Sequence, residues 1–252
     1  MLRHRARFGR PLLLSRVDRD LARKATAESV GTAFLVAVVV GSGIFAHRLS
    51  PGDAGLQLLE NSIATGAGLV ALILAFGAVS GAHFNPVVSL ADRALGGLTS
   101  RELAAYIPAQ VVGGCTGAVV ANLMFDLPAV TLSTHARSSG GLWLGEVVAT
   151  FGLLIVILGV VRSGRATSAP FAVGGYIAAA YWFTSSTSFA NPAVTIGRTL
   201  TDTFAGIKPS SAPGFIVAQL VGGALAVALA RFLYPTLPAG DIVVPHLEEE
   251  RS

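Results

Sequence analysis

Charged residues are scarce in this chain. Asp, Glu, Lys and Arg make up 13% of its 252 residues, 52% are hydrophobic, and the mean hydropathy is +0.66. This composition cannot cover a soluble domain of such a size with a solvated surface. The apolar residues instead form long runs, which are typical of membrane-spanning helices. The composition therefore excludes an ordinary soluble protein and predicts a single integral helical bundle.

Cysteine is nearly absent. Cys115 is the one cysteine, which excludes an internal disulfide, and its place in an apolar run indicates a small buried packing residue. The sequence also lacks a metal-ligand cluster, a nucleophile–base pair and a phosphate-binding loop. We therefore expect no enzyme, no cofactor and no metal. No small-residue cleavage site follows a short apolar core near the N-terminus, so we expect no removable signal peptide.

The basic residues concentrate outside the apolar runs. A pI near 9.7 could point to nucleic acid, but these residues stand in an N-terminal tail and in short loops, which favours the lipid bilayer as partner and not nucleic acid. If both termini lie on one side of the membrane, that side carries 14 of the 18 Lys and Arg residues. This asymmetry predicts a multi-pass protein of the cell inner membrane with both termini in the cytoplasm.

Apolar runs of roughly 20 residues match a hydrocarbon core of about 30 Å. Six runs are expected to cross the membrane, at 27–48, 58–79, 103–125, 142–161, 169–184 and 214–234. Two apolar segments, 81–96 and 188–204, are too short to cross and are expected to contain half-helices.

Each short segment holds an Asn-Pro pair, Asn85-Pro86 in the first and Asn191-Pro192 in the second. Pro is tolerated at the first turn of a helix, where its missing N–H costs nothing, and the preceding Asn can cap that helix. An isolated Asn-Pro is most often only a turn or a cap. Two of them at corresponding places indicate re-entrant half-helices and a channel or transporter site near the bilayer midplane.

The two halves of the chain repeat one another. The Asn-Pro pairs recur after 106 residues, and Ala-Gln-Val-Val-Gly-Gly at 109–114 matches Ala-Gln-Leu-Val-Gly-Gly at 218–223. Three spans per half is an odd number, so the second half inserts upside down and the all-α membrane fold is an inverted repeat. The expected segments are a basic, disordered cytoplasmic tail (1–26), the first repeat (27–126), an extracellular connection (127–140), the second repeat (141–235) and a cytoplasmic C-terminal tail (236–252).

Inverted symmetry brings the two half-helices end to end at the bilayer centre. Each N-terminus carries a partial positive charge and unsatisfied N–H donors. The side-chain amides of Asn85 and Asn191 are expected to point there as donors too. The midplane of the pore therefore offers hydrogen bonds to a solute and opposes cations.

With these motifs the chain resembles the aquaporin and aquaglyceroporin family over roughly residues 27–235. Asn-Pro-Ala at 191–193 is the family's signature, and Asn-Pro-Val at 85–87 is a variant of it. The resemblance implies six spans, two half-helices, a narrow pore in every protomer and a homotetramer. Val87 in place of Ala narrows the space beside the half-helix contact.

The resemblance also locates a selectivity filter, where this chain departs from the family. An arginine usually stands three residues after the second Asn, but Val194 occupies that position. Aligning the motifs places Thr65 at the filter position of the second span, Tyr181 near that of the fifth, and Ser188 in the loop. Together these residues imply a wide filter without a fixed cation. The pattern around them looks like a bacterial subgroup associated with arsenic-resistance genes.

We therefore expect a passive channel for small uncharged solutes, namely arsenous acid or methylated arsenicals, glycerol and urea, and for water. A strict water channel is one alternative. A proton-coupled secondary transporter is another, because Glu28 and Glu146 are carboxylates inside apolar spans. The resemblance favours a structural role for both, in which Glu28 braces the loop of His83 and Glu146 braces the loop 185–190.

Two residues have roles that the sequence leaves open. His83 is either a pore-lining group on the cytoplasmic side or a structural partner of Glu28. Arg198 lies one helical turn beyond Val194 on the same face. It is either a filter arginine displaced about 6 Å outward into the external vestibule or an ion-pair partner of Asp202, and we favour the ion pair.

Overall fold

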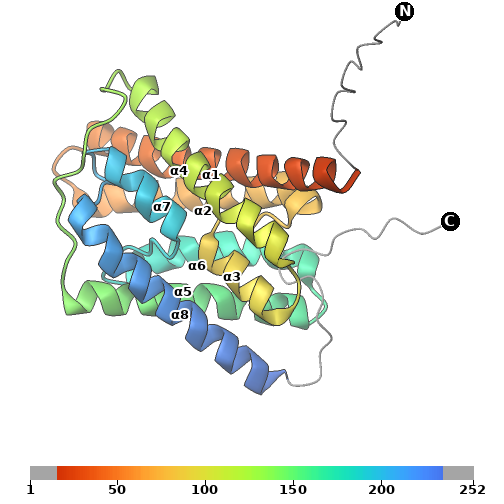
Figure 1. Cartoon of the computed structure of the whole chain (residues 1–252). Coiled ribbons are helices and arrows are strands. Elements are labelled where there is room, and N and C mark those ends of the chain that lie inside the picture. Colours follow the sequence, from red (N-terminus) through yellow and green to blue (C-terminus); the bar gives the residue numbers. More distant parts are fainter. Residues whose placement is uncertain (1–15, 235–252) are drawn as a thin grey trace, which may run out of the picture.

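The computed structural model describes residues 16–234, in which the regular elements are all helices and no strand occurs (Figure 1). The long helices are α1 (Arg16–Leu49), α2 (Ala54–Ser80), α4 (Ser100–Met124), α5 (Gly140–Arg162), α6 (Ala169–Phe183) and α8 (Ala212–Leu233). The short elements are the helices α3 (Pro86–Leu95) and α7 (Pro192–Gly197) and the 3₁₀ turns η1 (Ala166–Ser168), η2 (Arg198–Leu200) and η3 (Pro209–Ser211). The predicted all-α fold is confirmed.

Five of the long helices are long and apolar enough to cross a membrane, counted over the described part of the chain. The remaining one, α6, has 15 residues and directly continues the turn η1. At 1.5 Å per residue it is about 22 Å long. α6 packs against α2 and α5 within the bundle, so it takes the place of the fifth expected span although it is the shortest.

The packing of the helices repeats between the two halves. In the first half α1 packs against α4 and α2, and in the second half α5 packs against α8 and α6. The short helices α3 and α7 both contact α4 and α8, and Figure 1 shows them in the middle of the bundle. The start of α1 and the end of α8 lie on the same side of the bundle, as an even number of crossings requires (right in Figure 1).

Small residues let the helices of one repeat approach closely. A Cβ atom added at Gly113 would lie 2.1 Å from the carbonyl oxygen of Ser29, and one added at Gly117 would lie 2.1 Å from that of Ala33. Both contacts join α4 to α1. Side chains at these two positions would push the two helices apart, so the close contact requires glycine.

The helix α1 extends N-terminally beyond the expected span 27–48, into the segment that we predicted to be a disordered tail. Lys24 Nζ lies 3.0 Å from Glu102 Oε1, and Asp18 pairs with Arg101. Both partners stand in the first turn of α4, which gives the extra turns of α1 a surface to bind. The prediction of disorder is therefore wrong for this part of the tail, and the rest of both predicted tails lies outside the described residues.

The second half-helix is shorter than its apolar segment 188–204. α7 ends at Gly197, and the chain continues through η2 into irregular backbone. The long connection after α4 packs against this region, where the Ser133 N–H donates to Thr199 O at 3.0 Å.

Candidate functional site

Both short helices are capped by the asparagine that precedes them. Asn85 Oδ1 accepts a hydrogen bond from the Val87 N–H at 2.9 Å, and Asn191 Oδ1 accepts one from the Ala193 N–H at 2.9 Å. A proline follows each asparagine at the first helical turn, where it removes no helix hydrogen bond. The Asn-Pro pairs therefore fix where both half-helices begin.

The same two asparagines bind across the bundle. Asn85 Nδ2 donates to Ala190 O at 2.8 Å, and Asn191 Nδ2 donates to Phe84 O at 2.7 Å. Each asparagine thus binds the residue that immediately precedes the other asparagine. An amide nitrogen carries two hydrogens, so each side chain keeps one N–H that these bonds do not use. Both asparagines line the cavity described below, where that second N–H can serve a solute.

The loops that lead into the half-helices have left-handed backbone at equivalent positions. In the first loop Ala82 and Phe84 have φ values of 49° and 49°, and in the second loop Ser188 and Ala190 have φ values of 51° and 48°. Non-glycine residues in this region cost of order 1–3 kcal/mol each when the surroundings hold them in strain. The two loops therefore need external support to keep this shape.

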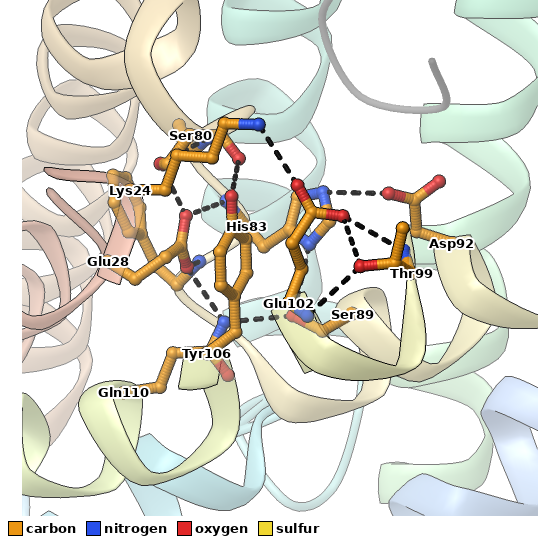
Figure 2. Close-up of polar contacts among 12 residues, drawn as sticks. Lys24, Glu28, Ser80, His83, Ser89, Asp92, Thr99, Glu102, Tyr106 and Gln110 are labelled. Carbon is orange, nitrogen blue, oxygen red and sulfur yellow. Dashed lines mark hydrogen bonds and ion pairs between the residues drawn. The ribbon is translucent and has the colours of Figure 1, made fainter. Parts of the chain in front are cut away.

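Glu28 supports the first loop (Figure 2). Its Oε1 accepts hydrogen bonds from Ser80 Oγ at 2.6 Å and the His83 N–H at 3.0 Å. Its Oε2 accepts from the Phe84 N–H at 2.7 Å and from Gln110 Nε2 at 2.7 Å. The carboxylate is fully buried, and these donors satisfy both of its oxygens.

Glu146 supports the second loop in the same way. Its Oε1 accepts from the Phe189 N–H at 2.8 Å, and its Oε2 accepts from the Ala190 N–H at 2.9 Å and from Gln219 Nε2 at 2.6 Å. Both glutamates therefore contact the loops that we expected them to brace. The matching glutamines, which the sequence offered only as landmarks of the repeat, are a second pair of bracing residues that sequence reasoning missed.

A cavity of about 60 Å³ runs between the two loops. One water molecule needs about 10–15 Å³ on this scale, so the cavity can hold a short file of waters or one small solute. Its wall comes from α1, α2, α5, α6 and both half-helix regions, and most of it is apolar. The residues with polar side chains in this wall are Thr65, His83, Asn85, Tyr181, Ser188, Asn191 and Arg198.

All four expected filter residues line this cavity. Thr65 Oγ1 on α2 and Tyr181 Oη on α6 are 3.2 Å apart and share a hydrogen bond. The hydroxyl of Ser188 is buried and has no hydrogen-bond partner among the described residues. Val194 adds an apolar surface to the same cavity. The wall thus combines hydroxyl groups with a valine side chain where the family usually has an arginine.

Arg198 also lines the cavity and is 2% exposed. Its Nε donates to Ala205 O, and its Cζ lies 3.4 Å from the centroid of the Phe189 ring. Asp202 accepts instead from the Thr134 N–H at 2.8 Å, a bond that lowers the pKa of the Asp202 carboxyl. No ion pair in residues 16–234 joins the two side chains, so the ion pair that we favoured is wrong.

Comparison with known proteins identifies the family. The family described as "Major intrinsic protein" matches residues 15–190. The chain belongs to the major intrinsic protein family. This membership confirms the predicted aquaporin-like fold and the predicted class of function, a passive transmembrane channel for small uncharged solutes and not an enzyme.

Several relatives cover nearly the whole of this major intrinsic protein. Aquaglyceroporin AqpS of Rhizobium meliloti is 53% identical over 89% of this chain and 94% of its own length. Aquaporin Z of Rhodopseudomonas palustris is 32% identical over 87% of this chain and 96% of its own length. The X-ray structure of the aquaglyceroporin from Plasmodium falciparum has a TM-score of 0.67 at 21% identity, covers 85% of this chain and 98% of that chain, and supports the fold alone.

His83 both contacts Glu28 and lines the cavity in this major intrinsic protein. Its backbone N–H binds Glu28, and its ring lines the cavity. Ring Nδ1 lies 3.0 Å from Ser89 Oγ, and ring Nε2 lies 3.3 Å from Asp92 Oδ2 (Figure 2). Gln110 Nε2 donates to the same Ser89 hydroxyl at 2.9 Å. The contacts of both ring nitrogens fix the orientation of the imidazole at this end of the cavity.

The variant signature residue Val87 packs against the other repeat. Its side chain is 2% exposed, and a Cβ atom added at Gly223 on α8 would lie 2.3 Å from Val87 Cγ1. The larger residue in α3 therefore fits because the facing residue has no side chain. This pairing explains how the departure from Ala leaves the contact between α3 and α8 intact.

Proposed function

We propose that this channel conducts glycerol, urea, arsenous acid and methylated arsenicals as well as water. The observation that carries the proposal is the cavity wall, where Val194 stands at the usual arginine position and the arginine that lines the cavity, Arg198, comes from four residues later in the chain. The hydroxyl groups of Thr65 and Tyr181 come from residues that line the same cavity, and they can replace part of the hydration shell of a neutral hydroxylated solute. A cavity wall with hydroxyl groups and a valine in place of an arginine favours polyhydroxyl solutes over water alone.

The relatives support this choice of solute. The Rhizobium meliloti relative is named an aquaglyceroporin, and its identity to this chain is 53%. Among the proposed solutes we rank the arsenicals first, because the residues around the second Asn-Pro resemble the subgroup associated with arsenic-resistance genes. Pore size does not separate these solutes from one another, so only flux measurements can order them.

We propose Asn85 and Asn191 as the midplane donors, with Pro86 and Pro192 setting their positions. The geometry in support is the unused N–H of each amide at the cavity and the two helix N-termini behind them. Helix N-termini carry partial positive charge, which opposes cations and leaves neutral solutes unaffected. Glu28 and Glu146 act as fixed braces in this proposal, because hydrogen-bond donors satisfy their carboxylates.

We also propose a homotetramer in the cytoplasmic membrane with both termini in the cytoplasm. The concentration of 14 of the 18 Lys and Arg residues on the side of the termini supports this orientation. The resemblance to the family supports the tetramer. The protomer offers large exposed apolar side chains for lipid or neighbouring protomers, among them Phe34, Ile63, Leu74, Phe171 and Trp182.

Light scattering from reconstituted proteoliposomes tests the proposed solutes. Vesicles are exposed to osmotic gradients of sucrose, glycerol and arsenous acid, with protein-free vesicles as the control. Re-swelling in glycerol and arsenous acid, on top of rapid water flux, is the expected result. Rapid water flux without re-swelling would leave the strict water channel. Uptake that requires a pH gradient would overturn the passive channel in favour of proton coupling.

A further inference from the structure

A buried guanidinium lies in the pore although the usual filter position holds Val194. Arg198 follows one turn later and lines the same cavity. No carboxylate within residues 16–234 forms an ion pair with it. Burial of an unpaired charge is costly unless the charge has a role or strong partners. The position of Arg198 therefore calls for an explanation beyond packing.

Two contacts hold the Arg198 side chain in position. Its Nε binds Ala205 O, and its guanidinium lies against the ring of Phe189 with 3.4 Å from Cζ to the centroid. Phe189 is itself fixed by an edge-to-face contact with Phe215 at 5.1 Å. The hydrogen bond of the Arg198 side chain to the described residues uses Nε and not the two Nη groups, and the residue lines the cavity. The charged end of the side chain is therefore fixed in position and free to meet a solute.

The inverted repeat places an acidic residue at the equivalent position of the first half. Arg198 and Asp92 each stand seven residues after the asparagine of their motif, and Phe189 and His83 each stand two residues before it. Each charged residue contacts the ring of its own loop, Asp92 at 3.3 Å from the His83 ring nitrogen. Arg198 lines the cavity whereas Asp92 lies behind His83. The basic residue at the outer end is thus the one that a permeating solute meets.

We propose that Arg198 is the cation barrier of this channel, placed one turn outside the filter. The proposal rests on the proposed function, because it assumes that the cavity is the conducting pore. A fixed positive charge in a low-dielectric wall repels sodium ions and hydronium ions strongly. Placing the charge outside the filter leaves the cross-section beside Val194 open. In this arrangement Arg198 repels cations, whereas the filter beside Val194 limits the size of the solute. The two Nη groups of Arg198 also serve as donors to the oxygens of an entering neutral solute.

Arg198→Gln tests the proposal in proteoliposomes, with Arg137→Gln as the matched control. Arg137 also lies over the Phe189 ring, 5.2 Å from Cζ to the centroid, but does not line the cavity. Sodium flux, proton flux and osmotic water flux are measured on the same vesicles. We expect Arg198→Gln to raise the sodium and proton fluxes by about tenfold or more, with water flux within about twofold of the unmodified protein, and Arg137→Gln to change none of them.

Two further variants keep the test decisive. Val194→Arg combined with Arg198→Gln returns a guanidinium to the usual filter position, so it must restore cation exclusion and abolish glycerol flux. Val194→Glu leaves the contacts of Arg198 in place and sets a carboxylate one turn away, so it must raise sodium flux even if Arg198→Gln fails to fold. Unchanged sodium exclusion in an Arg198→Gln or a Val194→Glu protein that still conducts water overturns the proposal. Failure of the unmodified protein to conduct glycerol would overturn only the proposed solutes.

Discussion

In Glu146→Gln, a side chain with one acceptor oxygen replaces a buried carboxylate that accepts hydrogen bonds from three donors. The Phe189 N–H, the Ala190 N–H and Gln219 Nε2 all lie within 2.6–2.9 Å of that carboxylate. Whichever way the new amide turns, its NH₂ group faces at least one of these N–H groups. An unpaired buried donor costs about 1–3 kcal/mol, and bonds to a neutral acceptor are weaker than those to a charged one. We therefore expect a loss of about 2–4 kcal/mol in the free energy of unfolding.

For a chain of this size that loss corresponds to a thermal midpoint lower by about 5–15 °C. Heating detergent-solubilised protein and measuring the monodisperse fraction by size-exclusion chromatography gives the midpoint. Thr150→Val is the matched control, because the Thr150 hydroxyl is buried on the same helix and has no partner among the described residues. Its removal should leave the midpoint nearly unchanged. A Glu146→Gln protein that is as stable as the control, but has lost uptake driven by a pH gradient, would refute the bracing role.

Three other substitutions test the pore wall and its support. Val194→Arg should abolish glycerol re-swelling in light scattering while water flux persists, and unchanged glycerol flux would remove Val194 from the filter. Tyr181→Phe deletes the hydroxyl that binds Thr65. It should lower glycerol permeability by several-fold with little change in water permeability. An equal fall in both permeabilities would contradict a role of Tyr181 in solute selection. Gly223→Ala should lower the thermal midpoint by several degrees, because its Cβ would meet Val87 Cγ1 at 2.3 Å, and Val87→Ala in the same chain should restore it.

The sequence predicts the site residues that are polar or acidic and lie within apolar segments. Asn85 and Asn191 were identified by their motif occurring twice, and Glu28 and Glu146 by being acids inside apolar runs. The partners that complete the braces were not identified, because Gln110 is 82 residues from its glutamate and no local pattern links them. Their occurrence at the same place in both repeats was the one available signal.

The error at Arg198 has a physical cause. The expected ion pair with Asp202 assumes one regular helix through both residues, since side chains four apart face each other only there. α7 ends at Gly197, so Arg198 and Asp202 do not lie on one α-helix and the four-residue spacing does not bring their side chains together. The helical start of α1 was missed for a related reason, because its support comes from ion pairs with the distant first turn of α4.

The crossed bonds of the two asparagines also bear on how the protein is made. Asn85 binds an oxygen supplied by the second repeat, and Asn191 binds one supplied by the first. During synthesis, a membrane-inserted first repeat therefore holds an asparagine whose acceptor does not yet exist. We therefore expect conduction only after the last helices have entered the membrane, and no leak through a half-made chain. We expect the fragments 1–126 and 127–252 to conduct when they are produced together and neither to conduct alone.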